Sequence, residues 1–330
     1  MSKIKFSGPL LPRISSFSAL MGIGLATTLR HKRGQKMAPD WDVNFEVGIR
    51  FWRRQFTKAM AMDMARGRVL FDSVQTETDE VYEVSAQPCE TPKGVWYHPK
   101  TRRSGATLLY LHGGGYAFRG AMSTRFAQML AHHIGAPLFA PHYRLTPEHS
   151  HPAQAEDALA AWRYVTREVD PAKVVVMGDS AGGHMALMLL QSLKAEGLSQ
   201  PALCIGMCPW TDIGDRGASM TGNDPTDMVQ GWMALKFGEW LDPNGTYGRA
   251  ALSPIEHDYQ DLAPIYLQAG GREVLRDMIR DFEQVQRAKG ADVRLEEWAD
   301  MPHDFQLYDG LKQASCEALA RICEEIAKRV

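Results

Sequence analysis

From about residue 80 onward, short runs of apolar and β-branched residues alternate with longer stretches of helical periodicity. Several runs are continuously apolar, which is typical of strands that are buried on both faces. Alternation of strand and helix predicts an α/β fold with a mostly parallel sheet covered on both sides. The eight candidate strands are Val81–Val84, Val95–Tyr97, Thr107–Leu111, Pro137–Ala140, Lys173–Met177, Ala202–Cys208, Ile265–Ala269 and Val293–Trp298.

Helices are expected between most of the later strands, at Ser123–Ile134, Gln154–Glu168, Ala181–Glu196, Glu273–Lys289 and Lys312–Lys328. Residues 210–254 interrupt this alternation, because they lie between two candidate strands and contain a helix of their own near Asp227–Leu241. A long excursion between core strands is usually functional. We therefore expect residues 76–209 and 255–330 to form the core, with 210–254 as the second part of a helical cap.

Residues 1–75 are expected to be helical and to supply the first part of this cap, because large apolar residues recur there at intervals of three or four (Trp41, Phe45, Ile49, Trp52 and Phe56). Phe17–Leu29 is mildly apolar and has basic residues on both sides. It is too short to span a bilayer, and no A-x-A cleavage site follows. We expect an amphipathic helix that packs on the enzyme; peripheral membrane contact by this helix is the less favoured alternative.

The strongest local signal is the pattern G-x-S-x-G at Gly178–Gly182, preceded by the candidate strand and followed by the candidate helix. A serine hydroxyl is a poor nucleophile unless it is exposed, held still and placed next to a base. A tight strand-to-helix turn lifts Ser180 out of the sheet, and the glycines on either side leave room for that bend. Ser180 is therefore the predicted nucleophile.

Three consecutive glycines follow an earlier strand, in the run His112-Gly113-Gly114-Gly115. Such a loop lets backbone N–H groups turn toward a ligand, and preorganised N–H donors stabilise the oxyanion of acyl transfer. We predict that Gly114 and Gly115 donate to this oxyanion together with Ala181, and that Gly113 shapes the turn.

A base and an orienting acid should follow the nucleophile in the chain, in the order acid and then histidine. His303 is the predicted base, because it lies in a loop just after the last strand, where ligands bind in open α/β sheets. Glu273 and Asp277 follow the preceding strand at a spacing that places them on one helical face. Glu273 is the predicted acid because it is nearer the strand end, and Asp277 is the runner-up.

Together these residues resemble the hormone-sensitive-lipase-like family of α/β-hydrolases, mainly its bacterial esterases. The similarity covers about residues 80–330 and rests on three runs, which are H-G-G-G at His112–Gly115, G-D-S-A-G-G at Gly178–Gly183 with its Asp179, and Y-R-L-T-P-E-H at Tyr143–His149. Many members carry aspartate at the acid position, where this chain has Glu273. The resemblance implies an α/β-hydrolase fold and hydrolysis of carboxylic esters with short to medium acyl chains, without a cofactor.

Other activities are compatible with the same residues. An amidase or formamidase would use the same triad, and a lactone hydrolase differs only in the shape of its substrate. A non-catalytic ligand-binding receptor is a remote alternative, since receptors that resemble this family lack the histidine that His303 supplies here.

Composition excludes several partners. The net charge of −2, with no basic stretch interleaved with aromatic residues, argues against nucleic acid. The five cysteines form no CxxC pair and the histidines have no zinc-site spacing, so we expect neither a metal nor a disulfide framework. A reducing, cytoplasmic location follows. A homodimer could form if Val293–Trp298 lies at the edge of the sheet.

Overall fold

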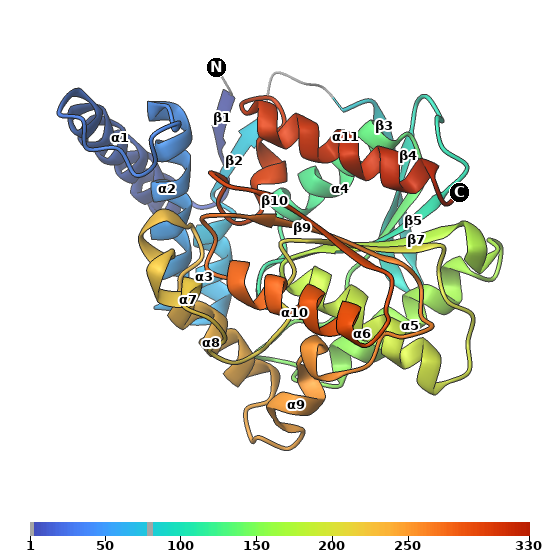
Figure 1. Ribbon diagram of the computed structural model, residues 1–330. Helices are drawn as coiled ribbons and strands as arrows, with labels where there is room; N and C mark the ends of the chain where they lie inside the picture. The colour runs from blue at the N-terminus through green and yellow to red at the C-terminus, as the bar shows by residue number, and fades with distance from the viewer. Residues whose placement is uncertain (1–2, 78–81) are drawn as a thin grey trace.

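The structure, a computed structural model, describes residues 3–77 and 82–330. An eight-stranded sheet forms its centre, in the order β10-β9-β8-β7-β5-β6-β4-β3 (Figure 1). The five pairings from β10 to β6 are parallel and the two that involve β4 are antiparallel. The expected mostly parallel sheet is confirmed. Its strands are β3 (Val84–Glu90), β4 (Lys93–Pro99), β5 (Thr107–Leu111), β6 (Leu138–Pro141), β7 (Val174–Asp179), β8 (Leu203–Met207), β9 (Ile265–Gly270) and β10 (Val293–Trp298).

The first strand of this sheet differs from the prediction. A strand was expected at Val81–Val84, but β3 begins at Val84 and continues to Glu90, while Val81 lies outside the described residues. Most β3 side chains are exposed because the strand lies at the edge of the sheet. An edge strand needs no continuous apolar run, so a search for such runs misses it.

Helices cover both faces of the sheet, as expected (Figure 1). Apolar side chains alternate between the two faces along each strand, so β7 directs Val176 into one hydrophobic cluster and Val175 into the other. One face carries α5 (Ala153–Val165), α6 (Ala181–Ala195) and α10 (Arg276–Ala288), and the opposite face carries α4 (Ala121–Ile134) and α11 (Gln313–Ala327). β10 lies at the other edge of the sheet, as predicted, whereas dimerisation through that edge stays a prediction.

The N-terminal region is not helical throughout, which corrects the expectation for residues 1–75. It contains a two-stranded antiparallel sheet in which Phe6 pairs with Val74. Pairing between segments so far apart in the chain depends on how the intervening helices pack, and four-residue strands leave little periodic signal. The elements are β1 (Lys3–Phe6), α1 (Leu10–Lys32), α2 (Val43–Met60), α3 (Met64–Phe71) and β2 (Val74–Glu77).

Helix α1 packs on the enzyme with only one of its faces. Its fully buried side chains are Ser16 and Thr27. Seven large apolar side chains on the helix are instead 45–79% exposed: Leu10, Leu11, Ile14, Phe17, Met21, Leu25 and Leu29. The helix does pack on the enzyme, as expected, and Ala19, Leu20 and Ile23 lie against the core, but these seven apolar side chains take no part in that packing.

The excursion between β8 and β9 contains α7 (Ser219–Gly222), α8 (Gly231–Leu241) and α9 (Gly248–Leu252). It contacts the N-terminal helices directly, since Arg53 of α2 forms an ion pair with Asp224 at 2.5 Å. Short 3-10 turns complete the described chain at Pro171–Lys173, Asp224–Thr226, Pro254–Glu256 and Phe305–Tyr308. The ion pair between Arg53 and Asp224 joins the N-terminal helices to the excursion, so two segments that are distant in sequence lie over the same end of the sheet.

Candidate active site

Ser180 occupies the turn between β7 and α6 and has a strained backbone, with φ 53° and ψ −118°. A non-glycine residue rarely adopts such a positive φ, and strain of this kind concentrates at functional sites. The turn is tight, because a Cβ atom on Gly182 would lie 1.9 Å from the carbonyl oxygen of Leu111. The glycine that sequence analysis associated with the bend is thus required by close backbone contact.

His303 and Glu273 meet at the carboxyl ends of the last two strands. The Nδ1 of His303 lies 2.6 Å from Oε2 of Glu273, and the other carboxylate oxygen accepts a hydrogen bond from the Gly270 N–H at 2.7 Å. Both side chains are at least 99% buried. A Nδ1–H that donates to a carboxylate leaves Nε2 as the basic nitrogen. Nε2 makes no hydrogen bond with the described residues, and His303 lines the same pocket as Ser180.

Asp277 is directed elsewhere. Its Oδ2 accepts a hydrogen bond from the Ser219 N–H at 2.8 Å, and its carboxylate pairs with Arg276. α10 begins at Arg276, so Glu273 lies in the turn before the helix. The expectation that both acids share one helical face is therefore wrong. Glu273 points back to the end of β9, while Asp277 braces α7.

The environment of His303 favours its protonated form. Burial by itself lowers the pKa of the imidazole, but the carboxyl groups of Asp304, Glu273 and Asp227 outweigh it and raise the pKa above the ordinary value. Oδ2 of Asp304 lies 3.4 Å from Nε2 of His303. Burial raises the pKa of Asp304 in turn. A carboxyl group therefore lies beside each ring nitrogen of His303, that of Glu273 at Nδ1 and that of Asp304 at Nε2.

The glycine loop presents backbone donors to the same pocket. The N–H groups of Gly114, Gly115 and Ala181 form no hydrogen bond within residues 3–77 and 82–330. Gly114 and Gly115 have positive φ values of 93° and 61°, which glycine adopts without a steric penalty. Three unpartnered N–H groups around one pocket provide the geometry needed to hold an oxyanion.

Gly113 differs from its two neighbours because its N–H is already occupied. It donates to Oδ1 of Asp179 at 2.9 Å, and the Tyr110 hydroxyl donates to the same oxygen at 2.6 Å. A Cβ atom on Gly113 would lie 2.2 Å from Oδ2 of Asp179. Gly113 therefore shapes the turn, and Asp179 anchors the glycine loop beside the nucleophile.

His112 contacts the backbone of the glycine loop and does not line the pocket that contains Ser180. Its Nδ1 lies 2.7 Å from the Gly113 carbonyl oxygen, and burial lowers its pKa to about 3, so the ring is neutral. Tyr143 stacks on this ring and donates its hydroxyl proton to the His112 carbonyl at 2.7 Å. The Y-R-L-T-P-E-H run thus acts on the glycine loop, a role for Tyr143 that sequence reasoning missed.

Asp227 is the second residue that sequence analysis did not identify. Its Oδ1 accepts from the backbone N–H of His303 at 3.1 Å, and its Oδ2 accepts from that of Val274 at 2.8 Å. This fully buried carboxyl, contributed by the excursion, links the loop of the acid to the loop of the histidine. The sequence marked Asp227 only as the start of an expected helix, whereas α8 begins at Gly231.

Cys208, Glu273 and His303 each place a possible metal-ligating atom within 4.8 Å of the others. The carboxylate and the imidazole are already hydrogen-bonded to each other at 2.6 Å. Burial raises the pKa of the Cys208 thiol well above its usual value, which keeps the thiol protonated. The Cys208 sulfur in turn accepts a hydrogen bond from the Asp304 N–H at 3.4 Å, so all three groups already have partners within the protein.

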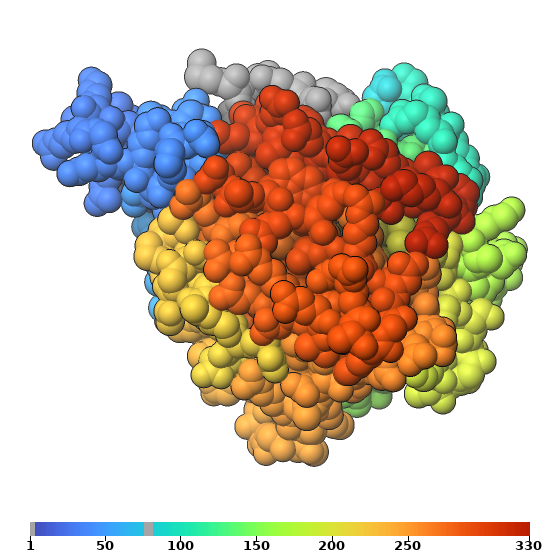
Figure 2. Space-filling view, viewed as in Figure 1, coloured from blue at the N-terminus to red at the C-terminus, as the bar shows by residue number. Residues whose placement is uncertain are grey.

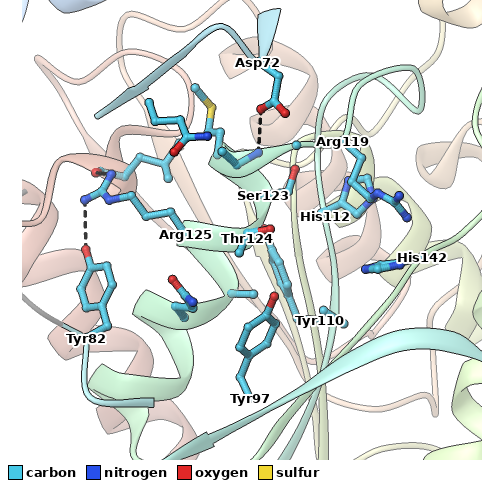
Figure 3. Close-up of a pocket in the computed structure, with 18 of the residues that line it drawn as sticks. Asp72, Tyr82, Tyr97, Tyr110, His112, Arg119, Ser123, Thr124, Arg125 and His142 are labelled. Carbon is cyan, nitrogen blue, oxygen red and sulfur yellow. Dashed lines mark hydrogen bonds between the residues drawn. The ribbon is translucent and has the colours of Figure 1, made fainter. Parts of the chain in front are cut away.

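The catalytic groups line a small cavity of about 50 Å³. Its walls are apolar and come from both cap segments as well as the core: Phe56, Phe71, Phe118, Phe126, Trp210, Met228, Val229, Ala234, Phe237, Leu275 and Leu307. A larger groove of about 870 Å³ adjoins it, and the two share Met122, Ser123, Met228 and Leu307 as lining residues. Polar side chains line this groove, and Figure 3 shows Arg119 close to His112 and His142.

Comparison with known proteins agrees with this geometry. A family model described as the alpha/beta hydrolase fold matches residues 108–307. An acetyl-hydrolase of Streptomyces hygroscopicus is 38% identical over 216 residues, which is 64% of this chain and 72% of that protein. An ethyl acetate hydrolase of Pseudomonas putida is 27% identical over 69% of this chain and 74% of its own length. A crystal structure of an esterase from the bacterial hormone-sensitive lipase family is 26% identical, with a TM-score of 0.71 over 98% of this chain and 99% of that one.

Proposed function

The chain belongs to the α/β-hydrolase fold family, to the branch of the hormone-sensitive-lipase-like esterases, and we propose that it hydrolyses carboxylic esters with Ser180, His303 and Glu273 as its triad. Hydrolysis of small-molecule esters follows from the family and from relatives named as esterases. The roles of the individual residues are the proposal. The observation that carries it is that the strained Ser180, the Nε2 of His303, which makes no hydrogen bond with the described residues, and three unpartnered N–H groups lie around one pocket.

In the proposed reaction, Nε2 of His303 takes the hydroxyl proton of Ser180 as its oxygen attacks the ester carbonyl. The N–H groups of Gly114, Gly115 and Ala181 hold the oxyanion. Collapse of the tetrahedral intermediate expels the alcohol, which receives the proton from His303. A water molecule then attacks the acyl-enzyme, and His303 again carries the proton, so that Ser180 is restored and the carboxylic acid is released. Glu273 stabilises the imidazolium in both steps.

The cavity supports a short acyl group. Its volume of about 50 Å³ accommodates an acetyl or similarly small group, whereas the open groove beside it has room for the alcohol part of the ester. Two relatives carry the names acetyl-hydrolase and ethyl acetate hydrolase, which supports the same preference. Both cap segments contribute to the cavity wall, so we assign the limit on acyl size to the cap. A cytoplasmic location is also part of the proposal and is supported by five cysteines that form no disulfide.

Replacing the nucleophile tests the triad. Ser180→Ala should lower kcat for p-nitrophenyl acetate by about 10⁶-fold and abolish the pre-steady-state burst. The change removes one partly exposed oxygen, so circular dichroism and the unfolding midpoint should match the wild type. A variant that is folded yet keeps a burst would contradict the assignment of Ser180.

A further inference from the structure

The exposed face of α1 carries seven of the large apolar side chains that are exposed in the described part of the chain. Leu10, Ile14, Phe17, Met21 and Leu25 are each 51–66% exposed. At about 100° per residue they fall within about a quarter of the helix circumference, and Leu11 and Leu29 widen this to about a third. We call these seven residues the α1 stripe. Contiguous exposed apolar surfaces of this kind mark interaction sites.

The opposite face of α1 is fixed to the enzyme. The hydroxyl of Ser16 lies 2.8 Å from that of Ser73 and accepts a hydrogen bond from the Gln55 side chain at 2.9 Å. Thr27 is fully buried further along the same face. The helix therefore cannot turn its stripe inward without breaking buried hydrogen bonds. Figure 2 shows the N-terminal helices projecting from one side of the molecule.

The apolar surface continues beyond α1. Met62 and Val69, near α3, are 39% and 41% exposed. They line a groove with Leu11 and Pro12, and Lys58 and Arg66 also line it. The surface thus combines an apolar centre with a basic margin.

Charge distinguishes between possible occupants of this surface. Residues 1–39 contain seven Lys and Arg and neither Asp nor Glu, whereas the rest of the chain contains 30 Lys and Arg against 39 Asp and Glu. Arg13, Arg30, Lys32 and Arg33 form no ion pair within residues 3–77 and 82–330. Two copies that met through this face would bring like charges together. An anionic bilayer supplies both the apolar interior and the opposite charge.

We propose that the α1 stripe docks on the surface of a membrane containing anionic lipids, with α1 lying in the plane of the interface. Among the described helices, α1 alone is long and apolar enough to cross a bilayer. Its packed face, held by Ser16 and Gln55, favours the in-plane arrangement, because crossing would pull that face off the enzyme. Through α2 and α3, which contribute Phe56 and Phe71 to the catalytic cavity, the docked helix holds the active site near the lipid.

Vesicle flotation with the full chain tests this proposal. The probes are phosphatidylcholine vesicles with and without about a third phosphatidylglycerol, at low and high salt, and intact mass confirms that α1 is present. Wild type should float with the anionic vesicles at low salt. Binding should fall about tenfold or more for Met21→Ser combined with Leu25→Ser, and also at high salt. The control, Val285→Ser with Leu311→Ser, removes two exposed apolar side chains outside the stripe and should bind as wild type.

A second variant tests how much the basic residues of α1 contribute to membrane binding, apart from its apolar side chains. Arg30→Gln combined with Lys32→Gln and Arg33→Gln should weaken binding to anionic vesicles while leaving activity on soluble p-nitrophenyl acetate unchanged. Failure of wild type to float, or equal flotation of the Met21 and Leu25 variant, would overturn the proposal. So would a dimer in light scattering that this variant abolishes, since the stripe would then bind a second copy. None of these outcomes depends on the triad.

Discussion

Three carboxyl groups surround His303, the proposed base, and each has a different effect on it. Glu273 accepts from Nδ1 at 2.6 Å and fixes the tautomer, whereas Asp304 lies on the side of Nε2, where the hydroxyl of Ser180 must be deprotonated. Asp227 does not contact the ring and instead accepts a hydrogen bond from the backbone N–H of His303. Each raises the pKa of His303, yet only Glu273 is placed to orient the ring.

Exchanging the two candidate acids for amides separates their roles. Glu273→Gln should lower kcat by about 10³- to 10⁴-fold, because an amide neither fixes the tautomer nor stabilises the imidazolium. Asp277→Asn should cost no more than a few-fold in steady-state assays, because its carboxylate contacts α7 and Arg276 instead. The reverse order of effects would exchange the assignments.

Protonation of His303 should set the pH below which activity falls, and Asp304 should move that pH upward by raising the pKa of His303. The base must be neutral to accept a proton, so a raised His303 pKa moves the acid limb of kcat/KM above the ordinary value of 6.5. Asp304→Asn removes one cause of that rise, and the limb should move about one unit toward lower pH. An unmoved limb in the pH profile would mean that the Asp304 carboxyl is protonated throughout the working range.

At the scale of elements, the loop after β5 is positioned by residues from three other segments. Asp179 from the end of β7 holds the Gly113 N–H, and Tyr143, after β6, stacks on His112. From the cap, Arg68 of α3 donates to the carbonyl groups of Ala117 and Thr146. The oxyanion donors are therefore fixed by contacts among motifs that lie far apart in the sequence.

A methyl group on Gly113 should displace this loop. The added Cβ would meet buried carboxylate and backbone atoms of Asp179, so the Gly114 and Gly115 donors must shift. Gly113→Ala should lower kcat by about 10²- to 10³-fold, with a smaller change in KM. Gly105→Ala is the control, since its Cβ would meet only a Val330 methyl group at 3.7 Å. Full activity of the Gly113 variant would show that the loop tolerates displacement.

At the scale of the whole molecule, the two segments that we propose as the cap supply part of the wall of the cavity beside Ser180. Phe56 and Phe71 reach the cavity from the N-terminal helices, and Met228 and Phe237 reach it from the excursion. Arg53 joins the two segments through Asp224. The nucleophile therefore works in a cavity whose size depends on both parts of the cap.

Activity should fall as the acyl chain of the substrate lengthens. We expect kcat/KM for p-nitrophenyl octanoate to be at least about tenfold below that for the acetate, since the longer chain exceeds the cavity. Phe237→Ala removes part of the cavity wall and should bring the kcat/KM values for the acetate and the octanoate closer together. Trp240→Ala, on the same helix but outside the cavity, should leave it unchanged. A ratio near one for wild type would contradict a cap-limited acyl site.

The sequence alone was enough to predict the mostly parallel sheet, Ser180 in its tight turn, a glycine loop beside it and His303 after the last strand. These features depend on local spacing, which sterics and hydrogen bonding translate directly into turns and strand ends. Only the tertiary structure decided that Glu273 rather than Asp277 meets His303, that Asp227 joins their loops, and that the α1 stripe faces outward. Periodicity shows which residues share a face, but the packing of distant segments decides where that face points.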